Sequence, residues 1–132
     1  MPRPRSDQPT PGELEVLQVL WRLGPATVRE VMDALNATRP RAYTSVMSLL
    51  NVMVDKGLLE KEPRGRAFAY VACAQEEPTL RQLVGDLLQR AFRGSAGQLV
   101  AHALEQTDPS PAELDELRRL IDAYRDRRED SR

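Results

Sequence analysis

One stretch of the chain, residues 42 to 70, limits the possible folds more than any other. Its first part carries apolar residues at helical spacing, and these are Val46, Leu49, Leu50 and Met53. Lys56 and Gly57 are expected to end the helix, because a cation suits the last turn and glycine readily adopts the left-handed cap conformation. Residues 58 to 71 then predict two short strands on either side of a basic turn at residues 63 to 66. The stretch therefore predicts a helix that leads directly into a β-hairpin.

Two more helices are predicted before this stretch. Thr10 and Thr27 each begin a Thr-x-x-Glu capping box, in which the two side chains bond free backbone N–H groups at a helix start. Residues 36 to 40 form a short turn into the third helix. The apolar residues expected to face the core are Leu14, Leu17, Leu20, Trp21, Val28, Val31, Met32 and Leu35. The order of three helices and a hairpin is that of a winged helix-turn-helix.

Three amphipathic helices are predicted after residue 75, beginning near Glu77, Ser95 and Ser110. Their apolar residues recur at helical spacing, and these are Leu80, Leu83, Val84, Leu87, Leu88, Ala91, Phe92, Leu99, Val100, Ala103, Leu104, Leu114, Leu117, Ile121 and Tyr124. Short helices without a compact partner of their own are expected to bury such faces against a second copy of the chain. This part of the chain therefore predicts a homodimer.

The expected fold class is mainly α, and the chain divides into two parts. A winged helix-turn-helix domain of three helices and a two- or three-stranded β-wing is predicted over residues 10–73, and a helical dimerisation domain over residues 75–126. Residues 1–9 and 127–132 are expected to be disordered tails. The residues predicted to form the dimer interface are Leu83, Leu87, Phe92, Leu99, Leu104, Leu114, Leu117, Ile121 and Tyr124.

Composition argues against an enzyme and against a membrane protein. Cys73 and His102 are the only cysteine and the only histidine, so the chain cannot build an intramolecular disulfide, a Cys/His metal site or a Cys–His nucleophile–base pair. No glycine-rich phosphate loop is present, and no cofactor is expected. No apolar run approaches the roughly 18 residues that cross a bilayer, and the N-terminus lacks a signal-peptide pattern. We therefore expect a cytoplasmic, non-catalytic protein that does not insert into a membrane.

The distribution of charge favours nucleic acid more than the net charge of −1 does. Residues 38 to 72 hold six cations against three acids, whereas residues 73 to 132 hold nine arginines against twelve acids. A chain with this asymmetry can concentrate positive potential on one face while the rest stays acidic.

Several polar and basic residues are candidates for binding double-stranded DNA. Ser and Thr hydroxyls at the start of the third helix can contact base edges, and cations beside the helix and at the hairpin tip can contact phosphates. The candidates are Arg39, Arg41, Tyr43, Thr44, Ser45, Ser48, Asn51, Lys56, Arg64 and Arg66. Structural explanations compete with this one: a Thr-Ser pair can be a helix cap, an Arg-Gly-Arg turn can be merely solvated, and Tyr43 can pack on the first helix.

The chain also resembles the penicillinase-repressor family, the BlaI/MecI/CopY type of bacterial winged-helix transcriptional repressor. The resemblance covers roughly residues 11 to 124. It is strongest in Glu13-Leu14-Glu15-Val16-Leu17 with Leu20-Trp21, Thr27-Val28-Arg29-Glu30-Val31, Ala42-Tyr43-Thr44-Ser45-Val46-Met47, Lys56-Gly57-Leu58-Leu59, and Arg64-Gly65-Arg66-Ala67 with Tyr70. It implies a homodimer that holds two winged domains on a pseudo-palindromic operator and blocks transcription. In related repressors cleavage within the dimerisation region releases DNA, so a membrane sensor protease is a further partner that the resemblance suggests.

The chain departs from the family pattern at two places, and it also lacks the mark of the copper-responsive branch. Val52 stands where the third helix usually carries an arginine. The position that corresponds to the cleavage site falls near His102-Ala103, without the family's Asn-Phe pair. Cys73 is alone, whereas the copper-responsive relatives use a cysteine-rich C-terminal tail.

Two other functions are compatible with the same pattern. A winged-helix domain can use its third helix to hold a protein instead of DNA. A repressor can also bind a small-molecule effector between its C-terminal helices, which would make it a one-component sensor.

Overall fold

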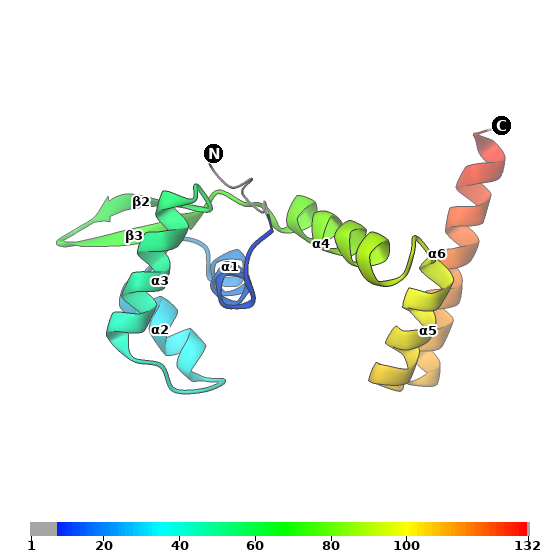
Figure 1. Cartoon of the computed structure of the whole chain (residues 1–132), viewed down its shortest axis with the longest axis horizontal. Helices are drawn as coiled ribbons and strands as arrows, with labels where there is room; N and C mark the ends of the chain where they lie inside the picture. Colours follow the sequence, from blue (N-terminus) through cyan, green and yellow to red (C-terminus); the bar gives the residue numbers. More distant parts are fainter. Residues whose placement is uncertain (1–7, 132) are drawn as a thin grey trace. The chain divides into compact units, whose positions relative to one another are not determined.

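The computed structural model describes residues 8–131. Its elements in chain order are α1 (Pro11–Leu23), β1 (Ala26–Thr27), α2 (Val28–Asn36), α3 (Tyr43–Asp55), β2 (Leu59–Arg64), β3 (Ala67–Ala72), α4 (Glu76–Ala91), α5 (Ala96–Thr107) and α6 (Pro111–Asp130) (Figure 1). The predicted fold class is confirmed: three helices and a β-wing are followed by further helices. Of the predicted tails, residues 1–7 and 132 lie outside the described residues.

The helices α1 and α2 begin with complete capping boxes. Thr10 Oγ1 accepts a hydrogen bond from the Glu13 N–H at 3.2 Å, and Glu13 Oε1 accepts one from the Thr10 N–H at 2.9 Å. Thr27 and Glu30 form the same pair of bonds at 3.2 and 3.0 Å. These local bonds satisfy N–H groups that a helix start leaves free. The two helix starts are therefore where the sequence predicts them.

The apolar core lies among α1, α2, α3 and the base of the sheet. Its buried members are Val16, Leu17, Val19, Leu20, Ala26, Val31, Leu35, Val46, Leu50, Met53, Leu59 and Tyr70. Trp21 packs against this core, and its indole N–H donates to the Ala74 carbonyl at 2.8 Å. That bond attaches the segment after β3 to α1. The described chain divides into two compact units inside α4, between Asp86 and Leu87, and the domain boundary at residues 73–75 stays a prediction.

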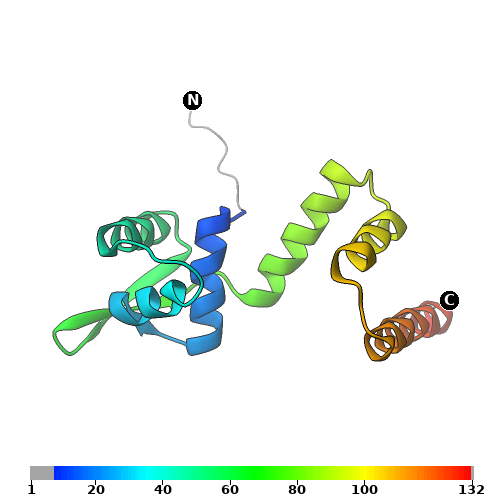
Figure 2. The same ribbon diagram turned by 90° about the horizontal axis from the view of Figure 1, so that it is seen from below.

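The wing is a three-stranded antiparallel sheet in the order β1-β3-β2. Its hairpin pairs Leu59 with Ala72 at the base and Arg64 with Ala67 at the tip, and it extends beyond the three helices in both views (Figures 1 and 2). The turn holds only Gly65, with φ of +63°, and Arg66. We expected the turn to start at Pro63, but Pro63 lies within β2. An edge strand tolerates proline because half of its N–H groups face solvent and need no partner.

The second unit contains the end of α4 with α5 and α6. Arg93 and Gly94, both with positive φ, separate α4 from α5, and the Phe92 and His102 rings lie 5.4 Å apart. The helix α6 continues to Asp130, whereas we expected disorder from residue 127. Its last turn is stabilised by the Arg127 guanidinium, which lies 5.2 Å from the Tyr124 ring centre.

Candidate nucleic-acid interface

The helix α3 has one buried and one exposed face. Val46, Leu50 and Met53 are at most 2% exposed and anchor α3 in the core. The predicted DNA-contacting residues of the helix all lie on the exposed side, and these are Tyr43, Thr44, Ser45, Ser48 and Asn51. The N-cap of α3 is Ala42, which cannot form a side-chain cap bond. Thr44 and Ser45 are therefore not caps, and their hydroxyls are exposed to solvent.

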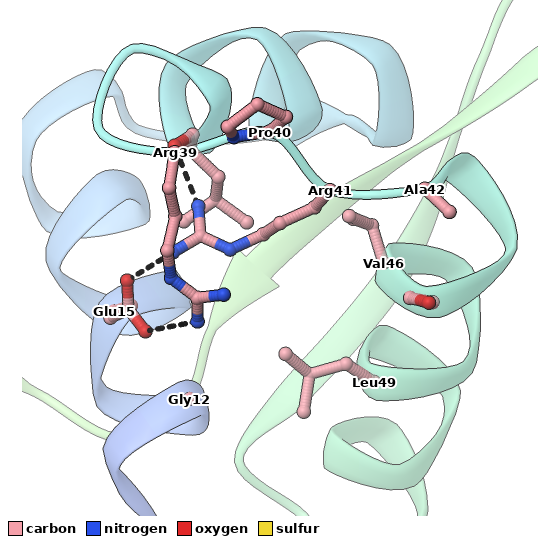
Figure 3. Close-up of a pocket in the computed structure, with 10 residues that line it drawn as sticks. Gly12, Glu15, Arg39, Pro40, Arg41, Ala42, Val46 and Leu49 are labelled. Atoms are coloured by element: carbon pink, nitrogen blue, oxygen red, sulfur yellow. Dashed lines mark hydrogen bonds and ion pairs between the residues drawn. The ribbon is translucent and has the colours of Figure 1, made fainter.

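Two arginines in the turn before α3 differ sharply in their surroundings. The Arg41 side chain is 12% exposed, forms an ion pair with Glu15 of α1, and donates to the Leu35 carbonyl at 2.6 Å. The Arg39 side chain is 66% exposed, and its nearest carboxylate contact is Glu15 Oε1 at 3.6 Å. Both guanidiniums lie beside a pocket of about 400 Å³ between α1 and the start of α3 (Figure 3). Arg39 is thus available to an incoming phosphate, whereas Arg41 is occupied within the domain.

Lys56, at the end of α3, forms an ion pair with the buried Glu13 of α1. The Lys56 Nζ to Glu13 Oε2 distance is 2.7 Å, and the Glu13 side chain is 2% exposed. Burial alone would raise the pKa of Glu13, but hydrogen bonds from Lys56 and Thr10 outweigh it, so this pKa lies below its ordinary value. Lys56 is therefore a structural cation of the domain, whatever further contact it makes.

The wing tip presents two arginines in different states. Arg64 Nη1 lies 2.7 Å from Glu30 Oε1 at the start of α2, although the Arg64 side chain is 54% exposed. Hydrogen bonds from Thr27, together with the charge of Arg64, hold the pKa of Glu30 below its ordinary value. Arg66 is exposed and forms no ion pair with any residue that the structure describes. The full charge of Arg66 thus faces solvent at the tip.

The second unit exposes apolar side chains along α5 and α6. Of the predicted interface residues, Leu83 of the first unit is half-buried. In the second unit, Phe92, Leu99 and Leu104 are half-buried, and Leu87, Leu114, Leu117, Ile121 and Tyr124 are exposed. A mainly apolar groove of about 460 Å³ runs between α5 and α6, lined by residues that include Leu104, Leu117 and Ile121. Among the described residues of this unit, none covers the groove or the apolar stripe that Leu114, Leu117, Ile121 and Tyr124 form on α6.

Comparison with known proteins identifies the family. The model of the family described as Penicillinase repressor matches residues 9–123. The chain belongs to the penicillinase repressor family. The transcriptional regulator BlaI of Mycobacterium tuberculosis is 35% identical over 114 residues, covering 83% of this chain and 81% of that protein. The penicillinase repressor of Bacillus licheniformis is 25% identical over 118 residues, covering 89% and 92%.

A solved structure supports the fold independently. A MarR family protein from Bacillus stearothermophilus matches with a TM-score of 0.50 and 19% identity, over 90% of this chain and 74% of that chain. At this identity the likeness concerns the fold alone. Membership of the penicillinase repressor family, and not this likeness, makes the chain a transcriptional repressor with a winged-helix DNA-binding domain, and the family is non-enzymatic. Among the described residues, no helix is long and apolar enough to span a membrane.

Sequence reasoning overlooked some exposed residues of this repressor. Lys61 of β2 lies opposite Tyr70, with its Nζ 5.4 Å from the Phe68 ring centre and 5.9 Å from that of Tyr70. Phe68 is itself 52% exposed on the wing. On α6, Leu120 is 60% exposed and extends the apolar stripe. The two-residue alternation along β2 and β3 was the signal for the first two residues, and helical spacing from Leu117 was the signal for the third.

Proposed function

We propose that this repressor acts as a homodimer that binds a pseudo-palindromic operator and thereby blocks transcription. One recognition helix from each protomer, α3, would enter the major groove at each half-site. The observation that carries this proposal is the division of α3, which buries Val46, Leu50 and Met53 in the core while its short polar residues face solvent.

We assign the base and phosphate contacts by exposure. Thr44, Ser45, Ser48 and Asn51, with Tyr43 beside them, are proposed to contact base edges and the adjacent backbone. Arg39 and Arg66 are proposed to contact phosphates, because Arg66 forms no ion pair within the described residues and Arg39 is 66% exposed, with Glu15 Oε1 at 3.6 Å. Arg64 and Lys56 already form ion pairs with Glu30 and Glu13, so each would contribute less to a phosphate contact.

The dimer is proposed from the uncovered apolar surface of the second unit. Leu114, Leu117 and Ile121 are 37–56% exposed on one face of α6, and they border the groove against α5. A second copy that covers this surface would remove it from water and would align two winged domains for a two-fold site. The dimerisation region would then span residues 75–126.

Two associated features follow from the proposal. Operator binding places the repressor in the bacterial cytoplasm. A membrane sensor protease is not included as a partner, because His102 and Ala103 lie inside α5 and lack the Asn-Phe pair of the cleaved relatives. A protease would need to unwind α5 before it could act there.

The experiment is a titration of the full chain on DNA from upstream of its own gene. We expect footprinting to show two half-sites about one helical turn apart, and anisotropy to show affinity that falls steeply as salt rises. A scrambled duplex of equal length serves as the control. Equal affinity for both duplexes, or affinity that does not depend on salt, would contradict an operator-binding role and favour a protein-interaction module.

A further inference from the structure

The start of α3 is held by contacts to other elements and not by a local cap. The N-cap residue is Ala42, with no side-chain cap bond, in contrast to the capping boxes of α1 and α2. Arg41, the residue before Ala42, instead forms the hydrogen bonds that attach the start of α3 to other elements. Its backbone N–H donates to Asn36 Oδ1 at 2.9 Å, and its guanidinium bonds the Leu35 carbonyl and the Glu15 carboxylate.

These bonds join three elements at one point. Glu15 lies on α1, whereas Leu35 and Asn36 end α2, so Arg41 fixes the entry of α3 against both preceding helices. The planar guanidinium is suited to this because it can donate to a carboxylate and a carbonyl at once. Its side chain is only 12% exposed, which leaves little of it for a phosphate.

Apolar packing gives less support on this side of α3. The pocket of about 400 Å³ lies between Glu15, Arg41 and the side chains of Val46 and Leu49 (Figure 3). Val46 and Leu49 pack against the core, but the pocket beside them is open to solvent, so fewer protein atoms contact this side of α3. The polar contacts of Arg41 therefore carry much of the constraint on the first turn of α3.

We propose that Arg41 and Glu15 form a clamp that sets the direction of α3, and that both are positioning residues for base discrimination. This inference rests on the proposed function, in which α3 contacts bases. Thr44 and Ser45 follow Arg41 within one helical turn, so a tilt at the clamp displaces their hydroxyls directly. Hydrogen bonds to base edges weaken steeply with misalignment, so a small displacement lowers discrimination.

Replacing Glu15 distinguishes the clamp from a purely electrostatic effect on DNA binding. Glu15 cannot bind phosphate, and neutralising an acid near DNA should strengthen binding to any duplex if electrostatics alone matter. Glu15→Gln should instead lose operator affinity by roughly tenfold, comparable to one mismatched base pair, while affinity for a scrambled duplex stays the same or rises. Asp33→Asn, which removes an exposed acid from α2, is the matched control and should keep full discrimination.

Arg41→Lys separates a clamp from a phosphate contact. Lysine keeps the charge but lacks the fork that reaches Glu15 and Leu35 together, so discrimination should fall as in Glu15→Gln with the salt dependence unchanged. The double variant Glu15→Gln with Arg41→Lys should discriminate the operator no worse than either single variant, because both substitutions break the same clamp. Arg22→Lys, at an exposed cation in the last turn of α1 that is not assigned to the interface, is the control that should retain both discrimination and salt dependence.

All variants are compared with the wild-type full chain below their melting temperatures, on operator and scrambled duplexes across a salt series. Glu15→Asp, which keeps the charge and shortens the reach, replaces any variant that does not fold and should show the same loss. The clamp is refuted if Glu15→Gln keeps wild-type discrimination, or if Arg41→Lys is normal while Arg41→Ala lowers the salt slope by about one. Failure of the wild-type chain to discriminate the operator would instead refute the proposed function.

Discussion

Glu13 both completes the cap of α1 and pairs with Lys56 at the end of α3. The first role is local and can be predicted from a Thr-x-x-Glu pattern. The second joins residues 43 positions apart and depends on how α3 packs on α1. Sequence reasoning therefore found the cap but assigned Lys56 to helix termination and DNA contact, without its buried partner.

The ion pair predicts a specific loss of stability in acid. The folded-state pKa of Glu13 is lowered from 4.5, so the pair contributes fully above that pH, and the contribution disappears as pH falls from 4.5 through the lowered value. Glu13→Gln keeps the capping box and removes the charge, and should cost about 1–2 kcal/mol at pH 7, a figure reduced because Lys56 is partly solvated. Urea unfolding measured from pH 7 to 3 should then show that the free energy of unfolding declines less steeply with falling pH in the variant than in the wild type. An identical decline in both proteins would show that Glu13 does not titrate this way.

Thr44 and Val46 lie two residues apart on α3, but their replacement should affect different properties. Loss of the Thr44 side chain should lower operator affinity, whereas truncation of Val46 should lower stability. Thr44→Ala should leave melting nearly unchanged but cost about 1–3 kcal/mol at the operator, with little effect on a scrambled duplex. Val46 is 2% exposed, so Val46→Ala should lower the free energy of unfolding by about 2 kcal/mol through a core cavity. Thermal melts and titrations at fixed salt measure both effects. Lower stability with intact discrimination in Thr44→Ala would move base contact further along α3, to Ser48 or Asn51.

At the scale of elements, the sequence predicted what local chemistry determines. Capping boxes, a glycine with positive φ after α3 and apolar periodicity placed the helices of the winged unit. The hairpin was longer than expected, because proline at an edge-strand position cannot be told from proline in a turn by sequence alone. Among the candidate site residues, exposure of the α3 side chains agrees with the helical pattern, whereas the partners of Arg41 and Arg64 depend on tertiary packing that no local motif encodes.

The wing offers a prediction about charge at its tip. Arg66→Ala should weaken operator and scrambled duplex about equally and lower the salt slope by roughly one, because its charge faces solvent. Arg64→Ala should have a smaller effect, since Glu30 already neutralises part of its charge.

Glu30→Gln provides the complementary change at the wing. It keeps a capping-box side chain at the start of α2, frees Arg64, and should strengthen binding to both duplexes severalfold. Anisotropy titrations across a salt series measure all three variants. Loss of discrimination with an unchanged salt slope in Arg66→Ala would assign the wing tip to bases instead of phosphates.

At the scale of the whole molecule, the two units have different chemistry. The winged unit has a dense core and an exposed polar helix, whereas α5 and α6 leave Leu114, Leu117 and Ile121 substantially exposed within one chain. Positive charge is concentrated in residues 38 to 72 and the remainder is acidic. A basic stretch within the winged unit and an exposed apolar surface on the other unit suit a protein in which one unit contacts DNA and the other contacts a second copy.

The double substitution Leu117→Asp with Ile121→Asp tests whether the second unit holds the dimer together. Both side chains are already exposed in the single chain, at 37% and 56%, so the charges should cost little in a monomer but several kcal/mol in an apolar seam. Sedimentation should show a monomer, and operator affinity should fall by about 100-fold or more, because the second winged domain no longer binds as part of the same molecule. Affinity for a duplex that holds one half-site should stay at the wild-type level. Ala112→Asp with Ala123→Asp adds the same charge to the opposite face of α6 and should leave the dimer intact. A tight dimer in the Leu117 and Ile121 variant would place the interface elsewhere. The exposed apolar residues of α6 would then be covered by a partner other than a second copy.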